Sequence, residues 1–144
     1  GILFMAPGAV MVAGLVTRRQ NGHIAIAGPL VNFGLFLIGI PLWGVILGLT
    51  GAFNVADSEA PYLVGSQLNW GQMLVDAGVF WVYANLFLGL FNMLPFGPLD
   101  GNKVKDWDEN AFYVTISVFA ILFLSIILGF WSPAAVLEAI ANFF

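Results

Sequence analysis

The stretch that decides the fold prediction is Asn92-Met93-Leu94-Pro95-Phe96-Gly97-Pro98-Leu99-Asp100-Gly101. It closes a run without charged residues, 77–99, and a membrane span needs only about 20 apolar residues. Its last seven residues include two prolines and two glycines, which an ordinary helix does not accommodate. The stretch therefore predicts a membrane-spanning helix that is broken near its end, with a carboxylate at the break.

The composition of the rest of the chain agrees with a membrane protein. Hydrophobic residues make up 60% of the 144 positions, and charged residues only 8%, whereas a soluble domain carries about 25% charged residues. Charge-free stretches cover 24–49, 77–99 and 111–131, and each is long enough to span a bilayer. A soluble protein with an unusually apolar core is the alternative, but three such stretches in so short a chain disfavour it.

These stretches predict an all-α membrane protein of about three transmembrane helices, in a single membrane domain covering 1–144. Pro7-Gly8 favours a short membrane-associated hairpin near the N-terminus. Gly28-Pro29 and Pro41 favour a bend or break in the first span. Ser132-Pro133 favours a helix start, and the helix that follows is predicted to be interfacial or to pack on the others. The predicted segments are the hairpin and cytoplasmic boundary 1–23, a span 24–50, a polar outer linker 51–71, a span with the broken segment 72–101, a span 111–131 and a terminal helix 132–144.

The few charges also predict an orientation and exclude some functions. All four basic residues lie at 18–19 and 103–105, and the linker 51–71 has none. The positive-inside tendency places 17–23 and 102–110 in the cytoplasm and 51–71 outside. A net charge of −4 without a basic patch argues against nucleic acid binding. The absence of cysteine excludes disulfides, thiolate metal sites and cysteine catalysis.

Two acidic residues lie next to predicted spans. Asp76 borders the outer linker, and we expect it to be solvated. Asp100 follows the charge-free run, and a carboxylate at membrane depth needs a counter-ion or a metal. Spacing alone leaves open a second interpretation, in which Asp100 is a cytoplasmic loop acid beside Lys103.

Two motifs bear on this choice. Residues 92–101 match the pattern N-x-x-P-x-x-x-x-D-G, and Ala27-Gly28-Pro29-Leu30-Val31-Asn32 matches A-G-P-x-x-N. Together, and in this order, they resemble the site-2-type intramembrane zinc proteases, the M50 peptidase family. The variant with Pro98 three residues after Pro95 is most similar to archaeal and bacterial members, which implies the plasma membrane of a prokaryote.

The resemblance implies roles for particular residues. Asp100 would be the third zinc ligand. Asn92 would offer its amide to the substrate backbone or to the developing oxyanion, and Asn32, Pro95 and Gly101 complete the implied substrate-binding set. Gly101 would also allow the tight turn behind Asp100. Simpler interpretations exist, because an asparagine can hydrogen-bond between helices and Gly28 can serve close helix packing.

The central motif of that family, H-E-x-x-H, is absent from this chain. The only histidine is His23, which we expect to be a solvated boundary residue, and a catalytic zinc needs about three protein ligands. We therefore expect no catalytic residue in these 144 positions, and an inactive chain in isolation. The prediction is a part of a longer zinc metalloprotease whose other helices carry H-E-x-x-H. Its predicted partners are a transmembrane protein substrate and the lipid bilayer.

Two other function classes stay open. A membrane scaffold or regulatory protein would keep the fold without zinc. A transporter also uses broken helices and carboxylates at membrane depth. It would favour paired repeats, and the sequence of the three spans shows no internal repeat.

Overall fold

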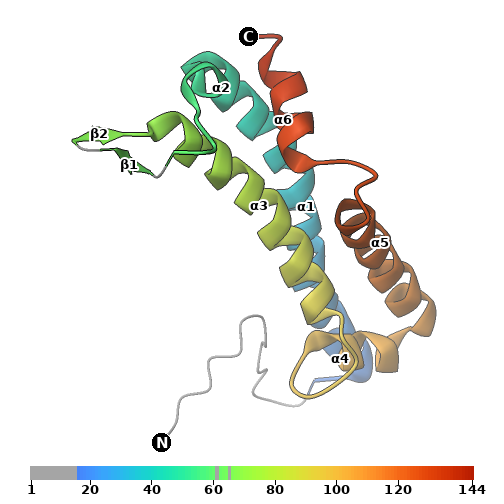
Figure 1. The fold of residues 1–144 in the computed structure, drawn as a ribbon. Coiled ribbons are helices and arrows are strands. Elements are labelled where there is room, and N and C mark those ends of the chain that lie inside the picture. Colours follow the sequence, from blue (N-terminus) through green and yellow to red (C-terminus); the bar gives the residue numbers. More distant parts are fainter. Residues whose placement is uncertain (1–15, 61, 65) are drawn as a thin grey trace, which may run out of the picture. The chain divides into compact units, whose positions relative to one another are not determined.

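The computed structural model describes residues 16–60, 62–64 and 66–144, which are mostly helical (Figure 1). Helices α1, α3 and α5 are long and apolar enough to cross a membrane, as far as length and composition decide. Their number agrees with the three predicted spans. The predicted N-terminal hairpin lies outside the described residues. The elements in chain order are α1 (Arg18–Thr50), α2 (Ala52–Val55), β1 (Leu63–Val64), β2 (Gln67–Leu68), α3 (Trp70–Asn92), α4 (Asp100–Trp107), α5 (Glu109–Ile127) and α6 (Pro133–Ala141).

Helix α1 begins six residues before the predicted span, and a reciprocal cap explains why. The backbone N–H of Gln20 donates to Thr17 Oγ1 at 3.3 Å, and the backbone N–H of Thr17 donates to Gln20 Oε1 at 3.0 Å. This is a capping box, which satisfies two N–H groups at once at a helix start. The polar run 17–23, predicted as a boundary segment outside the span, is therefore mostly the first turns of α1.

The first span was predicted to bend or break at its prolines. The break is wrong, because residues 18–50 are helical throughout, including Pro29 and Pro41, and the bend stays a prediction. A proline removes one backbone donor from the helix. Breaking the helix would free several more backbone groups, which apolar surroundings cannot satisfy. The continuous helix leaves fewer backbone groups without hydrogen bonds and is therefore lower in free energy in such a sequence.

The linker 51–71 contains structure that the all-α prediction missed. Strands β1 and β2 pair antiparallel, with Leu63 opposite Leu68. Asn69 follows the hairpin and starts α3, because its Oδ1 accepts from the N–H of Gln72 at 3.4 Å and its Nδ2 donates to the carbonyl of Asp57 at 2.7 Å. The linker is thus tied back onto the start of α3.

Capping residues also set the ends of the later helices. The predicted loop 102–110 is largely α4, and Asp108 ends it and begins α5 by accepting the N–H of Ala111 at 2.9 Å. Helix α5 ends at Ile127 and is followed by Gly129 with a φ of 77°, where the N–H of Phe130 donates to the carbonyl of Ser125 at 2.9 Å. That closure is a Schellman motif. Ser132 precedes α6 as predicted, with Pro133 first in the helix, but its side chain makes no capping hydrogen bond.

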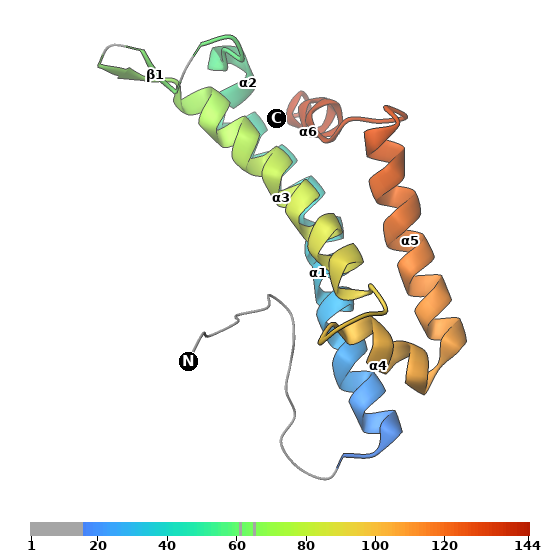
Figure 2. The same ribbon diagram turned by 60° about the horizontal axis from the view of Figure 1, so that its bottom comes forward.

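The chain divides into two compact units, which are described separately. Unit 1 comprises 16–34 and 85–124 of the described residues, and unit 2 comprises 35–84 without 61 and 65, together with 125–144. In unit 1 the buried Phe119 of α5 lies against Gly89 of α3, with its ring centroid 5.8 Å from that of Phe33 in α1. A second cluster joins α1, α4 and α5 to the residue that follows α3, through Ala25, Met93, Val104 and Phe112. Figure 2 follows the chain of this unit from α3 through α4 into α5.

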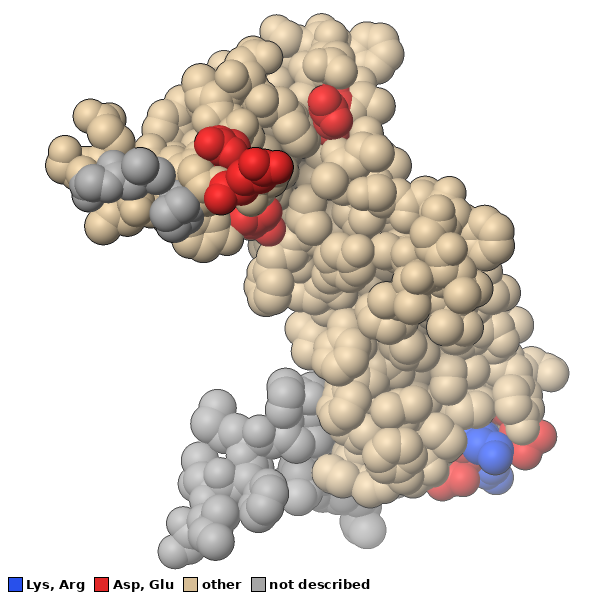
Figure 3. Space-filling view, viewed as in Figure 1, with Lys and Arg blue, Asp and Glu red and all other residues tan. Residues whose placement is uncertain are grey.

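Unit 2 has an apolar core, made of Leu47, Ala52, Val75, Leu137 and Ala141. The indole N–H of Trp81 in α3 donates to the carbonyl of Leu35 in α1 at 3.0 Å. Helix α6 packs on α1, where Ile140 lies directly over Gly44. By sequence, unit 2 has four acidic residues and no lysine or arginine, and the acidic side chains beside the hairpin stand out in Figure 3. Helix α6 is thus a packing helix, one of its two predicted roles.

Candidate functional site

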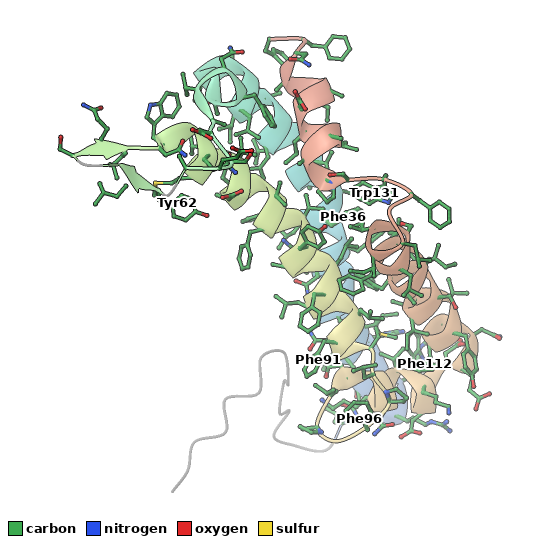
Figure 4. The ribbon with its side chains drawn as sticks, in the orientation of Figure 1. Phe36, Tyr62, Phe91, Phe96, Phe112 and Trp131 are labelled. Atoms are coloured by element: carbon green, nitrogen blue, oxygen red, sulfur yellow. The ribbon has the colours of Figure 1, made fainter. Side chains whose placement is uncertain are left out.

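The site is built on the segment 93–99, which connects α3 to α4 in unit 1. Helix α3 ends at Asn92, as the two prolines predicted, and tight bonds close its last turn: the N–H of Met93 donates to the carbonyl of Leu90 at 3.1 Å, and that of Leu94 to Phe91 at 3.1 Å. Gly97 then takes a φ of 63°, a conformation that glycine adopts without strain. Figure 4 shows Phe91 on the last turn of α3 and Phe96 in the connecting segment. The segment delivers Asp100 as the first residue of α4.

Gly101 is required here for close approach. A Cβ atom at this position would collide with the Met93 carbonyl and lie 2.6 Å from the Leu94 carbonyl oxygen. Gly101 is the second residue of α4, and the left-handed conformation of the connection is at Gly97 instead. Gly101 was predicted to allow the tight turn behind Asp100, and in the structure it allows close approach of backbone without a left-handed conformation. Gly101 lets the start of α4 press against the end of α3.

Asp100 is a buried carboxylate with one strong partner. Its side chain is 1% exposed, and Oδ1 accepts from Lys103 Nζ at 2.9 Å. Oδ2 lies toward α1, where a Cβ atom built on Gly28 would be 3.8 Å away. Unit 1 therefore brings together the two motifs on which the family resemblance rests, residues 27–32 and 92–101.

Two buried amides lie on α3 before Asp100. Asn92 is 4% exposed, and its Oδ1 has no hydrogen-bond partner among the described residues. Asn85 is 7% exposed and takes part in an interaction with its surroundings. Positions seven apart share a face of a helix, so both side chains lie on the face that carries Gly89.

Asn85 was not predicted from the sequence, although its spacing from Asn92 was the available signal. With Asp100, these amides are the only buried polar side chains found in the described part of the chain. A buried polar oxygen without a partner costs about 1–3 kcal/mol. The orphaned Asn92 oxygen therefore needs an explanation, and a bound group is one.

The other predicted site residues lie in less enclosed positions. Asn32 in α1 is partly buried, and Pro95 in the connecting segment is exposed. His23 is exposed, with its ring in edge contact with Trp107 at a centroid distance of 4.5 Å. Its exposure agrees with the expectation of a solvated residue. Among the described residues, His23 belongs to no group of three or more potential metal ligands.

The residues present fit one position of a zinc shell and not a whole one. Asp100 supplies a carboxylate oxygen of the kind that zinc accepts. Within 16–60, 62–64 and 66–144, no group of three histidine, aspartate or glutamate side chains is placed to hold a metal. A zinc ion at Asp100 would need its other ligands from outside these residues.

Asp76 in unit 2 forms a separate polar group. Its Oδ2 accepts from the Tyr62 hydroxyl at 2.6 Å, and its Oδ1 accepts from Gln72 Nε2 at 2.8 Å. The hydrogen bond to Asp76, with the negative charge of that carboxylate, raises the pKa of Tyr62 above its ordinary 10.0. Figure 4 shows Tyr62 beside the start of α3. This group ties the hairpin to α3, and Asp76 is partly exposed, as predicted.

Comparison with curated proteins finds a relative. The chain is 34% identical over 132 residues, 91% of its length, to a protein of Methanocaldococcus jannaschii whose name reads "Putative zinc metalloprotease". It spans 56% of the length of that relative. No protein-family model matches the chain, and no solved structure matches it significantly. The chain is thus related to a protein named as a zinc metalloprotease.

Proposed function

We propose that this chain is the part of a membrane-embedded zinc peptidase that contributes Asp100 to the metal. The observation that carries the proposal is the buried Asp100 carboxylate, whose Oδ2 lies beside Gly28 while Lys103 binds the other oxygen. The relation to a protein named as a zinc metalloprotease, and the two motifs, support the same conclusion. The three long apolar helices support a place in the membrane.

The proposed contributions of the chain are binding and orientation. A zinc ion, when bound, would lower the pKa of a water molecule toward about 7. Asp100 would be one of its ligands. Asn92 has a buried amide with an unpartnered oxygen, and it would bind the backbone of the peptide to be cleaved. The oxygen of that amide could only accept a hydrogen bond from the peptide, and its NH2 group is the part that could donate to a developing oxyanion. A donor placed there is worth on the order of 3 kcal/mol of barrier.

The remaining parts of the proposal extend the predictions made from the sequence. The other zinc ligands and the general base would come from residues outside the described part of the chain. The substrate would be a transmembrane segment of another protein, made accessible by residues that break its helix.

The test is replacement of Asp100 in the protein expressed from its complete coding sequence. We expect Asp100→Ala to lower zinc affinity by at least about 100-fold, since even loss of an outer-shell partner costs about 10–100-fold. Cleavage of a membrane-bound reporter should fall with it. Zinc content by elemental analysis and cleavage by gel are the measurements. Asp106→Asn is the matched control, because Asp106 is an exposed acid on the same helix.

The outcomes separate the function classes. Unchanged zinc binding in Asp100→Ala would show that Asp100 is not a ligand. A wild-type protein that binds no zinc would instead favour the scaffold or regulatory class, and a metal-free protein that moves a solute across vesicles would favour the transporter.

A further inference from the structure

In the ion pair between Asp100 and Lys103, the ammonium contacts one of the two carboxylate oxygens. Lys103 Nζ lies 2.9 Å from Oδ1, on the next turn of the same helix, and the lysine side chain is 26% exposed while the aspartate is 1% exposed. The other carboxylate oxygen, Oδ2, lies on the side of Gly28. The pair therefore leaves the two oxygens of one carboxylate in different surroundings.

The second lysine of α4 does not share this role. Lys105 Nζ lies over the ring of Phe112, 5.9 Å from its centroid. That contact is a cation–π interaction, which holds the ammonium against an aromatic face. Helix α4 therefore provides two lysines two residues apart, one on the buried carboxylate and one on a phenyl ring.

The physical effect of Lys103 is to fix the orientation of the carboxylate. A buried carboxylate without a partner is strongly disfavoured, and a charged hydrogen bond is stronger and more directional than a neutral one. With Oδ1 held by the ammonium, rotation of the carboxylate group would break that bond. Side chains that ligate metals are commonly held by such outer partners, whose loss weakens metal binding.

We propose that Lys103 is a positioning residue, which keeps Oδ1 of Asp100 and presents Oδ2 alone to a divalent metal. The inference rests on the proposed function, because it takes Asp100 as a metal ligand. It adds that binding is through one oxygen, and that the ion pair persists when the metal is bound. The opposite possibility is that the ammonium occupies the place of the metal and must leave before the metal binds.

The experiment is a metal competition titration on the protein made from its complete coding sequence, in detergent. Zinc is titrated against a chelating dye for wild type, Lys103→Met and Lys105→Met. We expect Lys103→Met to bind zinc about 10–100-fold more weakly than wild type, and Lys105→Met to bind it as wild type does. Lys103→Arg, which keeps a cation at this position, should recover part of the loss.

Two results would overturn the inference. Equal affinity in wild type and Lys103→Met would show that the lysine does not position the ligand. Tighter binding in Lys103→Met would show that the ammonium competes with the metal. Thermal unfolding of the metal-stripped proteins shows whether each variant folds. If Lys103→Met does not, Lys103→Gln replaces it, with a smaller loss expected and wild-type affinity again overturning the inference.

The same titration separates this inference from the proposed function. If Asp100→Ala binds zinc as tightly as wild type, the proposed function fails, and with it the role of Lys103. If Asp100→Ala loses zinc while Lys103→Met keeps it, the positioning role alone fails.

Discussion

The two units differ in where they keep their polar groups. Unit 1 buries Asn85, Asn92 and Asp100, and it contains all four basic residues of the chain together with four acidic ones. The buried cluster of unit 2 is apolar, and its Tyr62–Asp76 pair is solvent-accessible. Buried polar groups oppose folding unless they are satisfied. Unit 2 therefore has a core that favours folding, whereas unit 1 loses some folding stability at the site where it buries polar groups.

A pair of glycine variants offers the largest expected effect. In unit 1 a Cβ at Gly101 would collide with backbone of the segment before Asp100, and in unit 2 a Cβ at Gly71 would lie 2.9 Å from the backbone nitrogen of Ala56 and 2.6 Å from the Ala52 oxygen. We expect Gly101→Ala and Gly71→Ala each to destabilise by about 1–3 kcal/mol or more, because packed backbone cannot yield cheaply. Thermal unfolding in detergent measures this loss.

The same two variants should differ in their affinity for zinc. Gly101→Ala displaces the start of α4, where Asp100 lies, and should weaken zinc binding. Gly71→Ala should leave zinc binding near wild type at temperatures where it stays folded. If both variants lose zinc equally, the distinction between the units is wrong.

A second comparison lies inside unit 1, between its two buried amides. Asn92→Leu removes an oxygen without a partner, so the thermal midpoint should stay equal or rise. Asn85→Leu removes a side chain that has an interaction, so the free energy of unfolding should fall by about 1–3 kcal/mol and the thermal midpoint should fall with it. Reporter cleavage should fall about 100-fold in Asn92→Leu. A lower midpoint with unchanged cleavage in Asn92→Leu would make Asn92 a structural residue.

The smallest effect concerns Tyr62 in unit 2, whose pKa the Asp76 carboxylate raises above 10.0. A tyrosine with a raised pKa in the folded state adds stability below pH 10.0, and this contribution disappears as the pH rises through the folded pKa. Subtracting the tyrosinate absorbance of Tyr62→Phe from that of wild type should give one titration with a midpoint above 10.0. In an Asp76→Asn background that midpoint should move down. If the midpoint is the same in wild type and in the Asp76→Asn background, the pair does not form.

The sequence predicted the long elements well and their ends poorly. Hydropathy predicted three long apolar helices, and the two prolines at 95 and 98 predicted a break close to Asn92, where α3 ends. The start of α1 was missed because Thr17 and Gln20 form a capping box that reads as a polar loop. The hairpin at 63–68 was missed because four strand residues carry too little pattern.

The site was predicted by residue type more than by environment. Asp100 was singled out because a carboxylate next to a long apolar run is costly. Its pairing with Lys103 was one of two interpretations that spacing left open, and the structure contains this pair with the carboxylate 1% exposed. The closeness of Gly28 depends on how α4 folds back against α1, which no local pattern encodes. The role of Asp100 as a zinc ligand stays a prediction.

The contact between Phe119 and Gly89 has a consequence for how this sequence can change over time. A methyl group at position 89 would collide with the phenyl ring of Phe119, so neither position can gain volume while the other keeps its own. Substitutions here are expected in pairs, with a larger residue at 89 accompanied by a smaller one at 119. In an alignment of sequences that descend from this protein, positions 89 and 119 should covary, although 30 positions separate them along the chain.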